Sequence, residues 1–160
     1  MAHTLIGLIA DTHGLLRPEA VAALQGCAHI VHAGDIGSRS GEPRGVLDML
    51  AQIAPTTVVR GNNDRADWAT TIPCTADLEF ERVRIHVLHI LEELAIDPAA
   101  AGTHVVVSGH SHQPHVETRA GVLFVNPGSA GPRRFRLPVS VVRLWVEDGQ
   151  VEAELVTLLQ

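Results

Sequence analysis

The sequence is poor in residues that several common functions require. It has no tyrosine, 3% aromatic residues and two cysteines among 160 residues. With so few aromatic rings, we do not expect a platform for stacking nucleic-acid bases. Cys27 and Cys74 belong to no CxxC pair. We therefore expect no disulfide framework and a reducing, cytoplasmic environment.

Long apolar runs and an excess of basic residues are also missing. No segment approaches the ~20 uncharged apolar residues of a membrane span. Because the chain begins on a strand-like pattern, we expect no signal peptide. Eighteen acidic residues outnumber twelve basic ones, which gives a formal net charge of −6. Since nucleic-acid binding needs clustered basic residues, we expect neither a nucleic-acid nor a membrane partner.

The chain does contain a globular proportion of apolar residues and many histidines. Its 46% hydrophobic content and its length fit a single domain over residues 1–160. It also contains ten histidines. Histidine is the commonest transition-metal ligand and the usual acid–base group near neutral pH. The positions of the histidines therefore direct the search for a site.

The first third of the chain alternates apolar runs with helical patterns. We expect strands over residues 4–10, 29–33 and 56–60, and helices over residues 18–25 and 43–53. This order is typical of parallel βαβ units with right-handed crossovers.

The rest of the chain is richer in strands. We expect hairpins over residues 76–89 and 139–158 and strands over residues 103–108 and 122–125. A helix that a proline interrupts is expected over residues 92–101. We find no linker, internal repeat or low-complexity tract.

Nearly every expected strand ends in a polar cluster that contains glycine. Singly, such residues are often helix caps or turn formers, but capping alone does not account for five clusters in this order. In open α/β sheets, ligands bind beyond the carboxyl ends of the strands, so these residues should converge at one rim. In chain order the clusters supply Asp11 and His13, Asp35, Asn62 and Asp64, His89, and His110 and His112.

The chemistry of this set points to metals and phosphate esters. Carboxylate, imidazole and amide oxygen suit Mn, Fe, Co, Ni or Zn, whereas the lack of thiolates argues against a structural zinc site. Asp35 is our candidate bridge, because one carboxylate can offer an oxygen to each of two metals. Two divalent cations beside Asp11 and Asp35 retain positive charge, which favours a hydroxide and an anionic substrate. We therefore expect in-line hydrolysis of a phosphate ester.

These motifs resemble those of the calcineurin-like metallophosphoesterase superfamily, and most of all its small bacterial and archaeal phosphodiesterases. The resemblance covers essentially the whole chain and includes the Asn-Pro-Gly-Ser turn at residues 126–129. It implies a four-layer α/β/β/α sandwich of two mixed sheets. It also implies a hydrolase in which two divalent metals, with manganese favoured, activate a hydroxide to attack a small phosphate ester, preferably a diester.

The resemblance further implies a ligand set. Asp64 would orient a neighbouring group without touching metal. The first metal would be held by Asp11, His13, Asp35 and His112, and the second by Asp35, Asn62, His89 and His110.

Two positions depart from the family pattern. Many members carry a histidine that protonates the leaving group where this chain has Asn63, an amide that cannot act as a general acid. We therefore expect a preference for activated leaving groups, or a proton taken from water or substrate. Ile90 replaces a glycine that usually follows the metal-binding histidine. His86 is the alternative to His89, although it should face the other side of its strand.

Two further questions stay open at this level. The loop with Arg133, Arg134 and Arg136 is either a solvated basic loop or, through Arg134, a holder of the substrate phosphate. The rival to an enzyme is a non-catalytic interaction scaffold on the same fold, comparable to the retromer scaffold subunit that retains a phosphoesterase core. Apolar strand edges in the C-terminal hairpin could also pair in a homo-oligomer.

Overall fold

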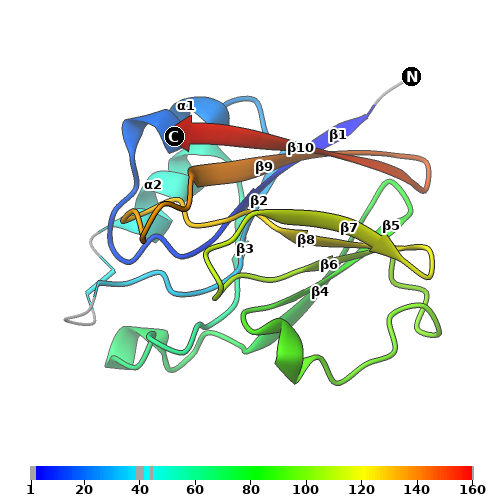
Figure 1. The fold of residues 1–160 in the computed structure, drawn as a ribbon, viewed down its shortest axis with the longest axis horizontal. Coiled ribbons are helices and arrows are strands. Elements are labelled where there is room, and N and C mark those ends of the chain that lie inside the picture. The colour runs from blue at the N-terminus through cyan, green and yellow to red at the C-terminus, as the bar shows by residue number, and fades with distance from the viewer. Residues whose placement is uncertain (1–2, 39–41, 44, 160) are drawn as a thin grey trace.

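Two five-stranded mixed sheets form the centre of the computed structural model, which describes residues 3–38, 42–43 and 45–159 (Figure 1). The first sheet has the order β10-β9-β1-β2-β3. In this sheet β1, β2 and β3 are parallel, whereas β9 and β10 run antiparallel. Its strands are β1 (Thr4–Ile9), β2 (His29–His32), β3 (Thr56–Val58), β9 (Val139–Glu147) and β10 (Gln150–Leu159).

The second sheet has the order β4-β5-β6-β8-β7. Its three central strands β5, β6 and β8 are parallel, and its two edge strands are antiparallel to their neighbours. Its strands are β4 (Thr75–Phe80), β5 (Val83–Leu88), β6 (Val105–Val107), β7 (His115–Arg119) and β8 (Val122–Asn126).

Strand β1 is buried on both faces, which explains its unbroken apolar run. Ile6 and Leu8 belong to the core between the two sheets. Leu5 and Ile9 point the other way, into a second core beneath α1 (Pro18–Ala23) and α2 (Val46–Ile53). A strand covered on both sides has no reason to alternate apolar and polar residues. The predicted sandwich of two mixed sheets is confirmed.

The outer face of the second sheet carries a thinner cover than the first. Leu91 and Leu94, in and after the 3₁₀ helix η2 (Leu91–Glu93), pack with the buried residues Leu88, Val106 and Val122. A second 3₁₀ helix, η1 (Asp67–Ala69), follows β3. No helix in the described ranges has the length and apolar character needed to cross a membrane.

The helix expected over residues 92–101 is wrong. Beyond η2 this segment forms turns, in which the backbone N–H of Thr103 donates to Pro98 O at 2.9 Å. Pro98 has no N–H to continue a helix. The carboxylate of Asp97 accepts the N–H of Ala100 at 3.3 Å, a local bond that competes with helix formation.

The start of one helix and the presence of one strand also differ from expectation. The helix expected over residues 43–53 begins only at Val46, after Gly45 in a left-handed conformation with φ of 74°, and Arg44 lies outside the described residues. Strand β7 was not predicted from the sequence. Its residues are mostly exposed, so they carry no apolar run, and pairing with β8 defines them as a strand.

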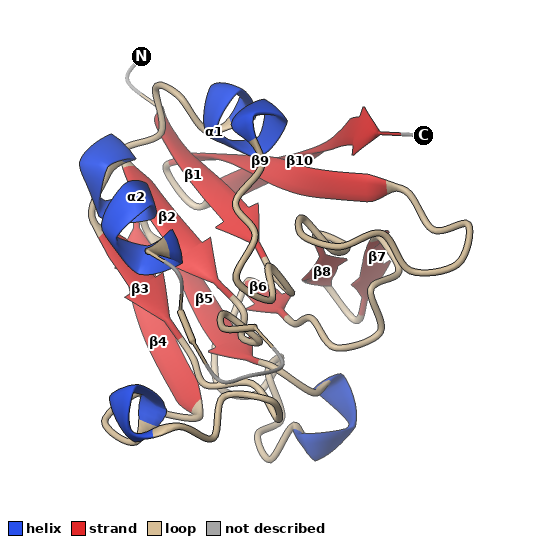
Figure 2. Cartoon of the chain, turned by 90° about the vertical axis from the view of Figure 1, so that its left-hand side faces the viewer, coloured by secondary structure: helices blue, strands red, loops and turns tan. Residues whose placement is uncertain are grey.

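The carboxyl ends of β1, β2 and β3 lie at one edge of the molecule, on the left of Figure 1. The loops that follow β5 and β6 reach the same edge, because Gly109 N–H donates to His89 O and His110 N–H donates to Asp11. Figure 2 looks toward this edge. The fold therefore gathers five strand ends from two sheets around one place.

Candidate metal centre

All seven side chains that the sequence predicts as metal ligands meet at this edge. They come from the loops after β1, β2 and β3 in the first sheet and after β5 and β6 in the second. Two groups have ligand atoms within 4.8 Å of one another: Asp11 with His13 and His112, and Asp11 with Asp35 and His89. The structure thus brings the predicted residues together.

The first cluster surrounds the buried carboxylate of Asp11. Its Oδ1 atom lies 3.5 Å from His112 Nε2 and 3.9 Å from His13 Nε2. Asp11 Oδ1 and His13 Nε2 are buried and have no hydrogen-bond partner among the residues that the structure describes. Buried polar atoms without partners are rare in native proteins. A carboxylate oxygen and imidazole nitrogens that face one another in this way fit a divalent cation.

The second cluster surrounds the side-chain oxygen of Asn62. Asn62 Oδ1 lies 2.9 Å from His89 Nε2 and 3.1 Å from His110 Nδ1. His89 Nδ1 lies 2.7 Å from Ala33 O, so that nitrogen carries the proton and donates to the carbonyl. The other nitrogen, Nε2, is then directed at the cluster, which is how proteins orient metal-binding histidines.

Asp35 lies between the two clusters. Its Oδ2 atom is 3.3 Å from His89 Nε2 in one cluster and 3.7 Å from His13 Nε2 in the other. This one oxygen of Asp35 therefore faces a histidine of each cluster. This placement fits the bridging position that the sequence predicts for Asp35.

Left-handed backbone conformations turn the ligand side chains toward one another. Alternate residues of an extended segment would point in opposite directions. His110 and His112 instead have φ of 73° and 63°, and Asp11, His13 and Asp35 have φ of 55°, 45° and 58°. Such values are uncommon outside glycine and persist only where the surroundings impose them.

Asp64 holds two of the ligand loops in place. Its carboxylate accepts backbone N–H bonds from Asp35 at 2.9 Å, Ile36 at 3.0 Å, Gly37 at 3.2 Å and Gly61 at 2.8 Å. A Cβ on Gly61 would lie 2.1 Å from Asp35 Oδ1, so this close approach requires glycine. Asp64 therefore ties the loop after β3 to the loop after β2.

Thr12 and His32 form a second support that the sequence did not single out as part of a site. Gly34 N–H donates to His32 Nδ1 at 3.1 Å, which assigns the ring proton to Nε2. His32 Nε2 lies 2.9 Å from Thr12 Oγ1, and that hydroxyl donates to Ile36 O at 3.0 Å. This network links the loops that carry Asp11 and Asp35. The pairing joins different strands, so spacing along the chain gives no signal for it.

Burial shapes the protonation of the first cluster. Burial raises the pKa of Asp11 to about 7, although the nearby His89 acts in the opposite direction. Burial also lowers the pKa of His13, and it lowers the pKa of His112 to about 4. Both rings are therefore neutral near pH 7, the form in which imidazole binds a cation.

The pKa of Asp35 is shifted in the opposite direction from that of Asp11. Burial alone would raise the pKa of Asp35, but the hydrogen bond and charge of His89 and the N–H of Asn63 hold it below the usual range. The pKa of His89 is raised, because its contacts with Asp35 and Asp11 outweigh the effect of burial. The pair therefore favours an ionised carboxylate at the shared position.

The alternative ligand His86 lies elsewhere. Its Nδ1 atom is 2.9 Å from Asp77 Oδ1 on the neighbouring strand β4. His89 reaches the second cluster instead, as the alternation along β5 predicts.

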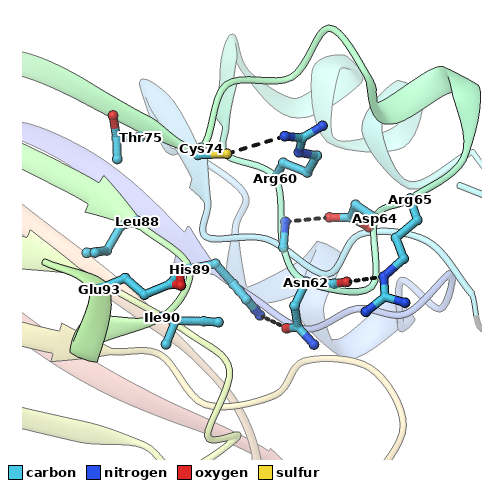
Figure 3. Close-up of a pocket in the computed structure, with 11 residues that line it drawn as sticks. Arg60, Asn62, Asp64, Arg65, Cys74, Thr75, Leu88, His89, Ile90 and Glu93 are labelled. Carbon is cyan, nitrogen blue, oxygen red and sulfur yellow. Dashed lines mark hydrogen bonds between the residues drawn. The ribbon is translucent and has the colours of Figure 1, made fainter.

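Room for a substrate adjoins the second cluster. A pocket of about 580 Å³ is lined by Asn62, His89, Leu88 and Ile90 among others. Figure 3 shows Asn62 and His89 pointing toward one another across the pocket, with Leu88 and Ile90 on the side of His89 and with Arg60 and Arg65 on the side of Asn62. Ile90, where the family usually has glycine, thus contributes an apolar wall beside the centre.

Arg134 lies on the side of the first cluster. Its side chain is exposed, and its positive charge lowers the pKa of Asp11, His13 and His112.

Comparisons with known proteins identify the family of the chain. A model of the calcineurin-like phosphoesterase superfamily domain matches residues 5–149. A probable metallophosphoesterase from Methanothermobacter thermautotrophicus is 32% identical over 164 residues, covering 95% of this chain and 91% of the relative. Another, from Methanocaldococcus jannaschii, is 32% identical over 168 residues, covering 96% and 81%. The chain belongs to the calcineurin-like phosphoesterase superfamily, a family of hydrolases that use divalent metals.

Solved structures share the fold at lower sequence identity. Vps29 from Chaetomium thermophilum is 22% identical with a TM-score of 0.75, covering 98% of this chain and 99% of that one. Yfce, a phosphoesterase from E. coli, is 22% identical with a TM-score of 0.69, covering 97% and 100%. Vps29 from Entamoeba histolytica, solved with Zn²⁺, is 20% identical with a TM-score of 0.69, covering 97% and 99%.

Proposed function

We propose that this protein is a phosphodiesterase that holds two divalent cations, with manganese favoured and Fe, Ni, Co or Zn as alternatives. The observation that carries the proposal is the position of Asp35 Oδ2, 3.3 Å from His89 Nε2 and 3.7 Å from His13 Nε2. A carboxylate oxygen that faces a histidine of each cluster would suit a site for two cations. The ligands proposed are Asp11, His13, Asp35, Asn62, His89, His110 and His112.

Such cations supply Lewis acidity toward phosphoryl oxygens and make water acidic enough to act as a nucleophile near neutral pH. The protein's part is to keep the ligands in place and in the right protonation state. Asp64 and the pair Thr12–His32 fix the loops. Burial keeps His13 and His112 neutral by lowering their pKa. Arg134 adds a positive charge for the substrate phosphate.

The shape of the surroundings supports a diester. The pocket beside Asn62 and His89 opens on one side of the centre. On the other side, Arg134 affects Asp11, His13 and His112. A phosphodiester has two substituents on phosphorus, and we expect the pocket to take one of them while the other lies toward Arg134.

The test is hydrolysis of bis(4-nitrophenyl) phosphate with added manganese. We expect turnover by the wild type and a loss of at least about 100-fold in Asp35→Ala, because the change removes a ligand shared by both cations. Asp48→Ala, at an exposed position in α2, is the matched control and should keep wild-type activity. Elemental analysis should find less bound manganese in Asp35→Ala only.

Two other results would redirect the proposal. A higher kcat/KM for 4-nitrophenyl phosphate than for the diester would show a monoesterase. The absence of manganese-dependent turnover, or equal turnover in wild type and Asp35→Ala, would overturn the enzyme and favour an interaction scaffold on the same fold.

A further inference from the structure

The segment between β8 and β9 contains a closed surface loop, residues 130–138, which we call the arginine loop. Its ends are adjacent, because Ser129 and Val139 form a parallel bridge and Ser140 N–H donates to Ser129 O at 3.0 Å. Compact loops of this kind, closed at the base, are frequently functional.

The base of the arginine loop is fastened to the loop that carries Asp11. Ala130 N–H donates to Ala10 O at 3.0 Å, and Ser129 Oγ donates to Asp11 O at 3.1 Å. A Cβ on Gly131 would lie 2.1 Å from Thr12 O, so the two backbones lie too close together for any side chain at position 131. In Figure 1 the two loops lie side by side at the left edge. The arginine loop is therefore held next to the metal centre.

The tip of the arginine loop exposes a large aromatic side chain. Phe135 is 89% exposed, whereas the other exposed large hydrophobic residues are 40–43% exposed. Its φ is 55°, a left-handed conformation that is costly for a bulky residue. The other two phenylalanines, Phe80 and Phe124, pack against the cores. The loop thus holds an aromatic ring in solvent at a cost in both hydration and backbone conformation.

Basic residues flank Phe135 in the sequence of the loop. Three of the twelve basic residues of an acidic chain lie within four positions, as Arg133, Arg134 and Arg136. All three are exposed, and their side chains have no hydrogen-bond or ion-pair partner in the part of the chain that the structure describes. Guanidinium groups left unpaired beside an anion site are suited to bind phosphate oxygens.

We propose that the arginine loop is the binding site for an aromatic substituent, an aryl group or a nucleobase, of the phosphoester substrate. Phe135 stacks on the aromatic group while Arg134 binds a phosphate oxygen. This inference rests on the proposed function and names its substrate class. An aromatic ring and guanidinium groups exposed on one loop, whose base is bonded to the loop of Asp11, match a ligand that is aromatic at one end and anionic at the other.

The experiment uses two diesters with the same leaving group, phenyl 4-nitrophenyl phosphate and methyl 4-nitrophenyl phosphate. Because the leaving group is shared and intrinsic reactivity is the same for every variant, a change in the ratio of their kcat/KM values between variants reports contacts with the retained substituent. We expect the wild type to prefer the phenyl diester. Phe135→Ala should lower the ratio by about tenfold, since stacking is worth roughly 1–3 kcal/mol by alanine substitution and 1.4 kcal/mol corresponds to tenfold.

Variants separate this role from a general loss of fold or activity. Phe135→Trp keeps a stacking ring and should keep the ratio. Leu155→Ala, an exposed apolar residue on β10, should also keep it. Arg134→Gln should raise KM for both diesters together, because both carry the same phosphate. A ratio that Phe135→Ala leaves unchanged would overturn the inference and favour a protein-docking role for the loop.

A binding measurement keeps this outcome apart from failure of the proposed function. Calorimetric titration with manganese present compares phenylphosphonate with methylphosphonate, neither of which is hydrolysed. Wild type should bind phenylphosphonate more tightly, and Phe135→Ala should abolish the difference. If neither diester is hydrolysed, the proposed function fails while this binding result still decides the role of the loop. Equal affinity of wild type for the two phosphonates would overturn it.

Discussion

The side-chain amide of Asn63 donates a hydrogen bond to Asp35 Oδ2 at 3.0 Å, and its backbone N–H donates to Asp35 Oδ1 at 2.9 Å. Both oxygens of the proposed bridging carboxylate are thus held by one residue. In many relatives this position carries a histidine, to which the resemblance assigns the role of acid. Here the side chain instead orients Asp35, and it has no proton to give to a leaving group.

Replacing Asn63 should therefore be mild compared with replacing its neighbour. In Asn63→Ala the backbone bond to Asp35 persists, and we expect kcat/KM toward bis(4-nitrophenyl) phosphate to fall by about tenfold or less. Asn62→Ala removes the oxygen that faces His89 and His110 and should cost more than about 100-fold. Manganese titration of activity should show weakened binding mainly in Asn62→Ala. The opposite order would mean that the roles of the two residues are exchanged.

Restoring an acid at this position should change which substrates react. General-acid catalysis contributes about 10²–10⁴-fold when the leaving group is poor. We expect Asn63→His to accelerate diesters with alcohol or phenol leaving groups while changing nitrophenyl diesters little. Measured across leaving groups of graded pKa, the wild type should show a steep decline and Asn63→His a shallower one. Asn63→Gln, which also lacks a proton to donate, should retain the steep decline.

The hydrogen bonds to the carboxylate of Asp64 lead to a prediction about the stability of the protein. It accepts four backbone N–H groups around the Asp35 loop. In Asp64→Asn an NH₂ group would face some of these donors, and charge-assisted bonds would be lost. We expect the free energy of unfolding to fall by about 2–3 kcal/mol, measured by urea unfolding in EDTA. The exposed Asp48→Asn in α2 should change it by less than about 0.5 kcal/mol. Equal losses would show that the Asp64 bonds do not stabilise the loop.

The candidate ligands could be predicted from the sequence because they lie shortly after short apolar runs. Asp11 and Asp35 lie in the loops just after β1 and β2, and the parallel order of those strands places both residues at one edge. What a linear pattern could not give is the backbone conformation at His110 and His112. Their left-handed φ is imposed by neighbouring loops, and neither residue type signals it.

Contacts that a linear pattern does not contain also explain why other expectations from the sequence were wrong or missing. Residues 92–101 have helical composition, but Pro98 and the local bond from Asp97 prevent a helix. Strand β7 exists through pairing with β8 and not through its own pattern. The placement of the arginine loop against the loop of Asp11 depends on Gly131 approaching Thr12, a contact between segments more than a hundred residues apart. Such contacts depend on the assembled sheets.

His32 and Thr12 connect the loop that carries Asp11 to the loop that carries Asp35. The ring is fully buried, and this burial lowers the pKa of His32 to about 3. In the folded protein His32 is therefore neutral through the whole range in which an exposed histidine titrates. Its Nδ1 accepts from Gly34 and its Nε2–H donates to Thr12, an arrangement that only the neutral ring can make.

This difference between folded and unfolded chains predicts how stability depends on pH. Below about pH 6.5 the unfolded chain takes up a proton on His32 that the folded chain refuses until about pH 3. The folded state is therefore stabilised at higher pH, and that contribution is lost as pH falls. Relative to His32→Gln, which cannot titrate, the wild type should lose about 2 kcal/mol of unfolding free energy between pH 7 and pH 5. Urea unfolding of both proteins in EDTA at the two pH values measures this loss. Parallel curves for the two proteins would show that His32 titrates alike in both states and that its burial does not govern acid stability.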